Sequence, residues 1–171
     1  MCRTSRTKRP VLWITTVVVV VAAAVGLYLF QPWRLFTSVR VDEAAPVATD
    51  QQGAAAKQLA TGAFISHEHG TSGSVEIQQL EDGKAALRLT NLRTSDGPAL
   101  HVWLSDQPVK QDGGGNLDDG KHVDLGALKG NEGNQNYAIP AGTDLNRFST
   151  VTIWCERFSV SFGAAELQQR A

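Results

Sequence analysis

The feature that most constrains this chain is an uncharged apolar run, Val11–Phe30, close to the N-terminus. A helix of this length, at ~1.5 Å per residue, spans the ~30 Å hydrocarbon core of a bilayer. Trp13 lies at one end of the run and Tyr28 and Trp33 lie at the other, where aromatic side chains favour the two membrane interfaces. The run therefore predicts one transmembrane helix whose partner is the lipid bilayer.

Charged residues on either side of the run predict its orientation. Residues 1–10 carry several Lys and Arg residues, whereas Arg34 and Arg40 follow the run at wider spacing and beside Asp42 and Glu43. By the positive-inside rule, residues 1–10 form a cytoplasmic basic tail and the rest of the chain lies outside the plasma membrane. The competing interpretation is a cleaved signal peptide, but its apolar region runs only ~7–15 residues and ends in small residues. We therefore expect an uncleaved single-pass anchor.

The remainder of the chain divides into a linker and one domain. Residues 31–61 are rich in Ala, Gln and acidic residues from Thr37 onward and show no sustained period, which predicts a flexible linker. Residues 62–168 instead show short runs of alternating apolar and polar residues separated by turn residues, and residues 169–171 form a tail. The expected strands are Gly62–His67, Ser74–Leu80, Ala85–Leu92, Leu100–Leu104, Val123–Leu128, Tyr137–Ile139, Thr150–Trp154 and Phe158–Phe162. Seven or eight such strands predict an all-β domain, an antiparallel β-sandwich.

Charge and cysteine content exclude several functions. The net charge of −1, with no basic cluster beyond the N-terminal tail, gives no reason to expect nucleic acid as a partner. Cys2 and Cys155 are predicted to lie on opposite sides of the bilayer, so no intramolecular disulfide is expected. The chain lacks Cys-x-x-Cys pairs, the histidine that would follow the cysteine of a blue-copper site, and EF-hand spacing in its loop Asp112–Gly120. No hydrolase or nucleotide-site motif predicts an independent catalytic activity.

Cys155 has two interpretations. It alternates with Val151 and Ile153, as expected for a buried thiol that acts as a small hydrophobe. The neighbouring Arg157 instead favours a reactive thiolate, because a nearby cation lowers the pKa of a thiol. The apolar alternation also changes phase around Glu156 and Arg157, which predicts either a β-bulge or a two-residue turn next to the thiol.

The four histidines all fall in the predicted domain. His67 and His69, separated by one residue, would place both rings on one face of a strand as a weak candidate metal pair. His101 lies on the expected solvent side of its strand beside Trp103, where it is a candidate for a surface site.

Four segments together resemble the electron-transfer DM-thirteen domain family. They are GAFISHEHGTSGSVEI, NLRTSDGPALHVWLS, LGALKGNEGNQNYAIPAGTDL and TVTIWCERFSVSFGAAEL, in the expected order between Thr61 and Leu167. The resemblance implies a β-sandwich related to DOMON-type domains and a role in electron transfer centred on the family's cysteine. That cysteine is Cys155 here, acting as a bare thiol or as a ligand to a prosthetic group such as haem. His69 matches the family's histidine position, and Ala99 departs from the Asp that often follows Gly-Pro.

Two functions from different classes follow. The first is a membrane-anchored, extracytoplasmic redox module in which Cys155 serves as thiol or haem ligand, with His69 or His101 as second ligand and an envelope redox protein as partner. The second is a non-catalytic envelope binding module with a structural cysteine. Its contact surfaces would be the loop Asp112–Gly120 and the stretch Gly130–Asn136.

Overall fold

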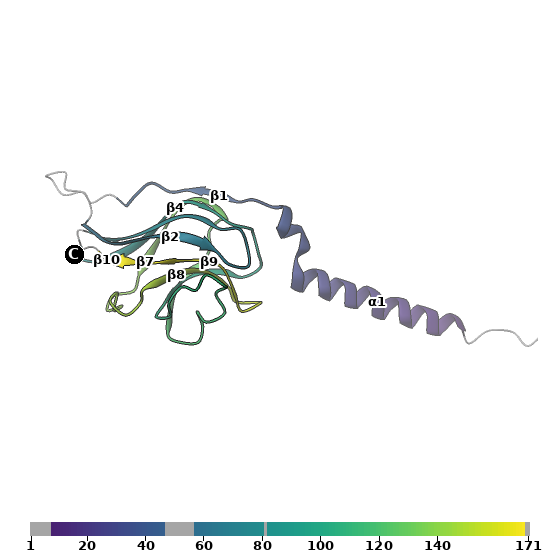
Figure 1. Ribbon diagram of the computed structural model, residues 1–171. Coiled ribbons are helices and arrows are strands. Elements are labelled where there is room, and N and C mark those ends of the chain that lie inside the picture. Colours follow the sequence, from purple (N-terminus) through teal and green to yellow (C-terminus); the bar gives the residue numbers. More distant parts are fainter. Residues whose placement is uncertain (1–7, 47–56, 81, 170–171) are drawn as a thin grey trace, which may run out of the picture.

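The computed structural model describes residues 8–46, 57–80 and 82–169 (Figure 1). An N-terminal helix, α1 (Lys8–Phe30), extends away from a β domain and leads into a short 3₁₀ helix, η1 (Pro32–Phe36). Within the described residues α1 is the one helix long and apolar enough to cross a membrane, and the apolar side chains of Val11–Phe30 are solvent-exposed. By length and composition this helix could serve as a membrane anchor or as a signal sequence.

Ten strands in the described residues form one curled sheet. They are β1 (Arg40–Asp42), β2 (Lys57–Ser66), β3 (Ser72–Gln79), β4 (Ala85–Arg93), β5 (Leu100–Ser105), β6 (His122–Ala127), β7 (Glu132–Ile139), β8 (Thr150–Cys155), β9 (Val160–Glu166) and β10 (Gln168–Gln169). Their order is β1-β7-β4-β3-β2-β9-β8-β5-β6, with β10 paired to β2. Neighbouring strands are antiparallel except β1, which runs parallel to β7. The prediction of a mostly β domain is confirmed.

The sheet is a curled half-barrel because β2 belongs to both of its halves. Residues Lys57–Ala63 of β2 pair with β3, and Phe64–Ser66 pair with β9. At the crossing, a Cβ on Gly62 would collide with the backbone carbonyl of Glu166, so glycine allows the two strands to approach closely. The predicted sandwich therefore fits only in part: two packed halves exist, but they are continuous, and the sheet is mixed rather than purely antiparallel.

The core lies between the two halves of the sheet. Ile77 and Leu87 from one half face Val102 and Ile153 from the other, and all four side chains are fully buried. The outer face of β5, β8 and β9 is also covered, because the loop between β5 and β6 places Leu117 against that face. A second apolar cluster forms there, comprising Trp103, Leu117, Trp154 and Ala164. Every residue of β8 is therefore buried, on both faces.

Part of the predicted linker is ordered against the domain. Arg40–Asp42 adds to the sheet as β1, and Lys57 to Thr61 form the first half of β2, whereas residues 47–56 lie outside the described residues. β1 is held by backbone pairing and by Glu43, whose carboxylate accepts hydrogen bonds from the Lys129 ammonium and the Asn136 amide, each at 2.7 Å. These contacts are non-local, so the composition of the segment could not reveal them.

Several predicted boundaries are corrected. β2 ends at Ser66, before the histidines, and β7 begins at Glu132 rather than Tyr137. The change of phase after Cys155 has two structural causes. β8 and β9 are joined by a four-residue turn, Glu156–Ser159, so the strand expected from Phe158 begins at Val160. In addition, Phe162 is an extra residue in β9, because Ile153 pairs with Gly163 but the next residue pairs with Ser161.

Candidate functional site

Cys155 is the last residue of β8 and points into the core. It pairs with Leu100 of β5 and Val160 of β9, and none of its surface is exposed. Its thiol donates a hydrogen bond to the carbonyl oxygen of Pro98, with Sγ and O separated by 3.2 Å. A buried thiol bonded to a neutral carbonyl is not free to attack another group, so Cys155 is inaccessible to a reaction partner in this conformation.

The loop Ser95–Ala99 covers the thiol. Its Ala99 adopts a φ of 56°, which is uncommon for a residue with a Cβ, and the Ala99 carbonyl accepts a hydrogen bond of 3.0 Å from the Glu156 amide. Gly97 packs so closely on the Phe162 ring that an added Cβ would lie 2.9 Å from it. The loop is therefore tightly seated, with a strained backbone at its end.

The segment after α1 holds this loop in place. The Arg34 guanidinium lies 3.2 Å from one Asp96 carboxylate oxygen, and the Thr37 hydroxyl donates to the other at 2.7 Å. Asp96 also accepts the amide of Gly97 at 2.8 Å. We refer to the contacts of Asp96 with Arg34 and Thr37 as the Asp96 latch.

The turn that follows Cys155 contacts the end of α1. The Arg157 guanidinium donates to the carbonyls of Tyr28 and Leu29. These are among the last carbonyls of the helix, which have no partner within it and which attract a positive charge. Phe158 stacks on Phe30, with ring centroids 6.0 Å apart. Cys155 therefore lies in the strand whose end faces the apolar helix.

A cavity of about 400 Å³ lies between this helix end and the domain. Most of its lining surface is apolar and comes from Phe30, Pro32, Pro98, Phe158, Val160 and Phe162, and the polar residues His69 and Asp96 also line it. Pro98 thus contributes to the cavity wall while its carbonyl binds the thiol of Cys155. Its size is within the range of small-molecule sites.

The structure separates the predicted histidines from one another. His67 and His69 follow β2 in a bend rather than sharing a strand face. Both ring nitrogens of His67 are engaged, Nδ1 with the Ser161 hydroxyl at 2.8 Å and Nε2 with the Lys110 carbonyl at 3.0 Å. The His69 ring lies 3.9 Å from the Phe162 ring and lines the cavity. A metal held by His67 would have to break one of these hydrogen bonds, so the geometry does not favour the predicted pair.

His101 lies on the opposite face of the sheet from Cys155. In the pairing of β5 with β8, Cys155 is opposite Leu100 and Trp154 is opposite His101, so His101 shares the outer face with Trp154. The ring of His101 is flanked there by the carboxylates of Asp124 and Glu156.

The residues predicted to bind haem do not fit that group. Cys155 is sealed behind Pro98 and lines none of the four cavities described, His101 faces away from it, and only His69 lines the apolar cavity. A haem iron could not reach Sγ while the loop Ser95–Ala99 is seated.

Comparison with known families defines the domain. The family model described as Electron transfer DM13 matches residues 63–167, which include nearly all of the curled sheet from β2 to β9. The chain belongs to this family. No curated protein and no solved structure matches it. The DM13 match assigns the domain a redox or electron-transfer role at the level of the family.

Some features of the DM13 domain were not predicted from the sequence. The stretch Gly130–Asn136, expected to be a contact surface, is mostly part of β7 and is covered by β1, with Gln135 fully buried. The Asp96 latch and the contacts of Arg157 join segments far apart in the chain, so no local pattern indicates them. Asp124, two residues before a glycine, carried a turn signal that could have suggested an oriented carboxylate.

Proposed function

We propose that this chain is a membrane-anchored redox module whose DM13 domain lies outside the membrane and exchanges electrons through Cys155. The family match supports the redox role, and the exposed apolar α1 with its basic N-terminal tail supports the anchor and its orientation. The observation that carries the assignment to Cys155 is its position. The thiol lies behind one loop, and that loop also forms the wall of a cavity at the end of the membrane helix.

The reaction that suits a lone thiol is thiol–disulfide exchange with a disulfide of an envelope partner protein. Cys155 loses its proton, its sulfur forms a bond to one partner sulfur, and the partner's S–S bond breaks. The second partner sulfur leaves as a thiolate and takes up a proton. The electron count balances without another oxidant, since the partner disulfide is reduced as Cys155 enters the mixed disulfide. On the predicted topology Cys2 cannot resolve this bond. A further thiol, distinct from the one just released, must attack the partner sulfur of the mixed disulfide and free Cys155, because attack by the released thiol would only reverse the exchange.

Access to the thiol then requires the loop Ser95–Ala99 to move. The Asp96 latch opposes that movement, while the strained Ala99 favours release of the loop once Asp96 is free. Opening would join the thiol to the cavity beside α1. The proposed site is therefore gated by contacts between the domain and the segment next to the membrane.

Thiol accessibility in the full-length chain tests the proposal. The chain with Cys2→Ser is placed in lipid nanodiscs and treated with an aromatic disulfide reagent that releases a coloured thiol on exchange. We expect slow reaction of Cys155 under native conditions and a several-fold faster reaction in Asp96→Asn. The matched control Asp82→Asn removes a carboxylate paired to Lys84 in an exposed hairpin and should leave the rate unchanged.

A second candidate is a binding module with a structural cysteine, which the complete burial of Cys155 favours. On that hypothesis the thiol reacts only when the whole domain unfolds. Its rate would then follow global stability and would be the same in Asp96→Asn and Asp82→Asn once matched for stability with urea. That outcome would refute exchange at Cys155.

A further inference from the structure

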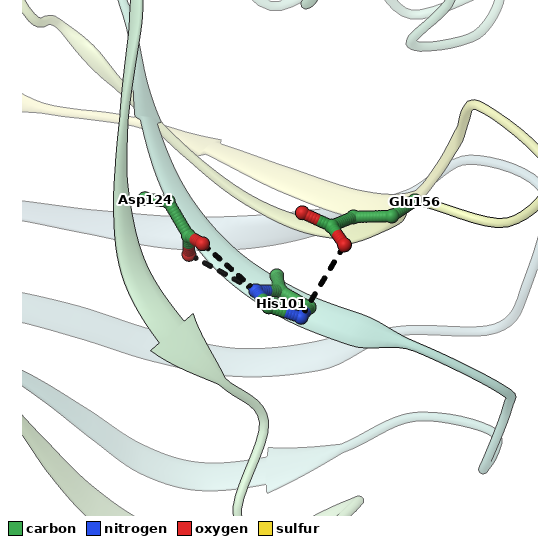
Figure 2. A group of neighbouring side chains, drawn as sticks. All are labelled: His101, Asp124 and Glu156. Atoms are coloured by element: carbon green, nitrogen blue, oxygen red, sulfur yellow. Dashed lines mark hydrogen bonds and ion pairs between the residues drawn. The ribbon is translucent and has the colours of Figure 1, made fainter.

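A second group of side chains lies on the outer face of the sheet, away from the thiol. His101 of β5 is flanked by Asp124 of β6 on one side and by Glu156, the first residue after β8, on the other (Figure 2). The His101 Nδ1 atom lies 3.0 Å from an Asp124 oxygen, and its Nε2 atom lies 3.6 Å from a Glu156 oxygen. One ligand atom from each residue lies within 4.8 Å of the other two. We call these three residues the outer-face cluster.

A local irregularity of the sheet aims Asp124 at the histidine. His101 pairs with Ala127, but Trp103, two residues later, pairs with Asp124, so β6 contains one extra residue. Gly126 in this bulge has a φ of 116°, a conformation that favours glycine, and its amide donates to Asp124 Oδ1 at 2.8 Å. Bulges commonly redirect a side chain next to a functional site. Here the bulge turns the carboxylate back toward the imidazole and fixes its orientation.

From this geometry we propose that the outer-face cluster is a binding site for a divalent first-row transition metal, with Zn²⁺ as the probe. One imidazole nitrogen and two carboxylate oxygens form the mixed nitrogen and oxygen ligand set that such ions prefer. Three protein ligands leave further coordination positions for water or for a group from a partner, as in open zinc sites.

Metal binding would require the carboxylates to move, because Asp124 lies beside Nδ1 of His101 and Glu156 beside Nε2, and a metal binds one of these two nitrogens. Zinc binds nitrogen and carboxylate oxygen at roughly 2.0–2.2 Å, so the three ligand atoms must draw closer together than they are now. The His101 side chain is 21% exposed and set in the sheet, whereas those of Asp124 and Glu156 are 40% and 45% exposed. The carboxylates are therefore the parts free to adjust. Trp154, which is 1% exposed, lies beside His101 on the neighbouring strand and keeps water from that side of the imidazole.

The ligand atoms of this site do not include the thiol, although the backbone amide of Glu156 also binds the Ala99 carbonyl of the loop that covers it. Glu156 follows Cys155 in the chain, but their side chains leave opposite faces of the sheet. Removal of the thiol therefore leaves all three ligands in place, and loss of the metal site leaves the thiol behind Pro98. The two proposals can fail separately, and Cys155→Ser is expected to bind Zn²⁺ as the wild type does.

Calorimetric titration of the metal-stripped, full-length chain in detergent with Zn²⁺ alone tests the inference. We expect one site per chain and a Kd at least ten-fold weaker in each of His101→Ala, Asp124→Asn and Glu156→Gln. Zn²⁺ should also raise the melting temperature of the wild type and not that of Glu156→Gln, which removes an exposed ligand without altering the sheet. Co²⁺ should give a visible spectrum without sulfur charge-transfer bands, because no thiol is in the site.

Two exposed residues outside the cluster provide controls. His122→Gln removes another surface histidine, one that stacks on Trp103, and Asp119→Asn removes an exposed loop carboxylate. Both should retain the wild-type Kd. Absence of Zn²⁺ binding by the wild type, or binding that is weakened equally by His122→Gln and by the three cluster variants, would overturn the assignment. The cluster would then be a group of polar side chains around His101 without a metal.

Discussion

The packing of Cys155 gives a quantitative prediction for the variant Cys155→Ala. Removing one fully buried heavy atom loses ~0.8 kcal/mol of transfer free energy, as for one methylene. The void left by one sulfur atom, on the order of 20 Å³, costs about 0.5 kcal/mol at ~24 cal/mol per Å³. The carbonyl of Pro98 also loses its donor in the closed core, which costs about 1 kcal/mol. We expect Cys155→Ala to lower the free energy of unfolding by about 2 kcal/mol.

The variant Cys155→Ser separates the hydrogen bond from the packing. Its hydroxyl can still donate to Pro98, so only the transfer and size differences between oxygen and sulfur remain, and we expect a loss of about 1 kcal/mol. Urea unfolding followed by tryptophan fluorescence measures both values, in chains carrying Cys2→Ser so that no other thiol interferes. In a domain of this size a change of 1 kcal/mol corresponds to a shift of roughly 4 °C in melting temperature.

A matched control removes one heavy atom at the surface. Ser72 of β3 is exposed, and Ser72→Ala should change stability by less than ~0.5 kcal/mol. The reasoning would be refuted if Cys155→Ala were as stable as the parent, or if Cys155→Ser were the less stable of the two. Either result would mean that the thiol does not fill the core and bind Pro98 as described.

Three further predictions concern the edge strand, acid stability and haem. Gly133 has a φ of 103°, and a Cβ added there would collide with the Val41 carbonyl. Gly133→Ala should therefore lower the free energy of unfolding by more than ~1 kcal/mol and abolish the hydrogen-exchange protection of β1. Retained protection of β1 would contradict this. Hydrogen bonds from Gln107 and then Arg147 lower the pKa of Asp106 to about 2. The stability that the ionised Asp106 carboxylate contributes to the fold is therefore present above about pH 4 and lost as the pH falls toward 2. Asp106→Asn should accordingly make the urea midpoint less dependent on pH in acid. The chain purified from haem-supplied cells should show no Soret band, and a band that Cys155→Ser abolishes would restore the haem hypothesis.

The parts of the fold that could be predicted from the sequence depend on local patterns. The uncharged run Val11–Phe30 sufficed for α1, and apolar alternation located β3, β4, β5 and β8 to within a few residues. Alternation does not report where a strand bends, so it could not show that β2 crosses from one half of the sheet to the other. The continuous half-barrel was therefore read as a sandwich.

The features that could not be predicted from the sequence depend on backbone pairing or on strand register. β1 has no core-forming side chains and joins the sheet through main-chain hydrogen bonds, so the composition of residues 31–61 indicated a linker. The outer-face cluster depends on the extra residue in β6, which brings Asp124 to His101 although neither neighbours the other in sequence. The candidate thiol was identified from its family position and alternation, but its seal by Pro98 required the tertiary structure.

The contacts around Cys155 indicate how a buried thiol could serve in electron transfer. Residues on one side of the cavity come from the end of α1 and from η1, and the residues that contact Asp96, Arg34 and Thr37, lie in or directly after η1. Under the proposed function, a partner that displaces this segment would free the loop Ser95–Ala99 and expose the thiol in one step. Under the same proposal, a thiol guarded in this way meets disulfides only at the docked interface, which protects it from exchange with small-molecule disulfides elsewhere in an oxidising compartment.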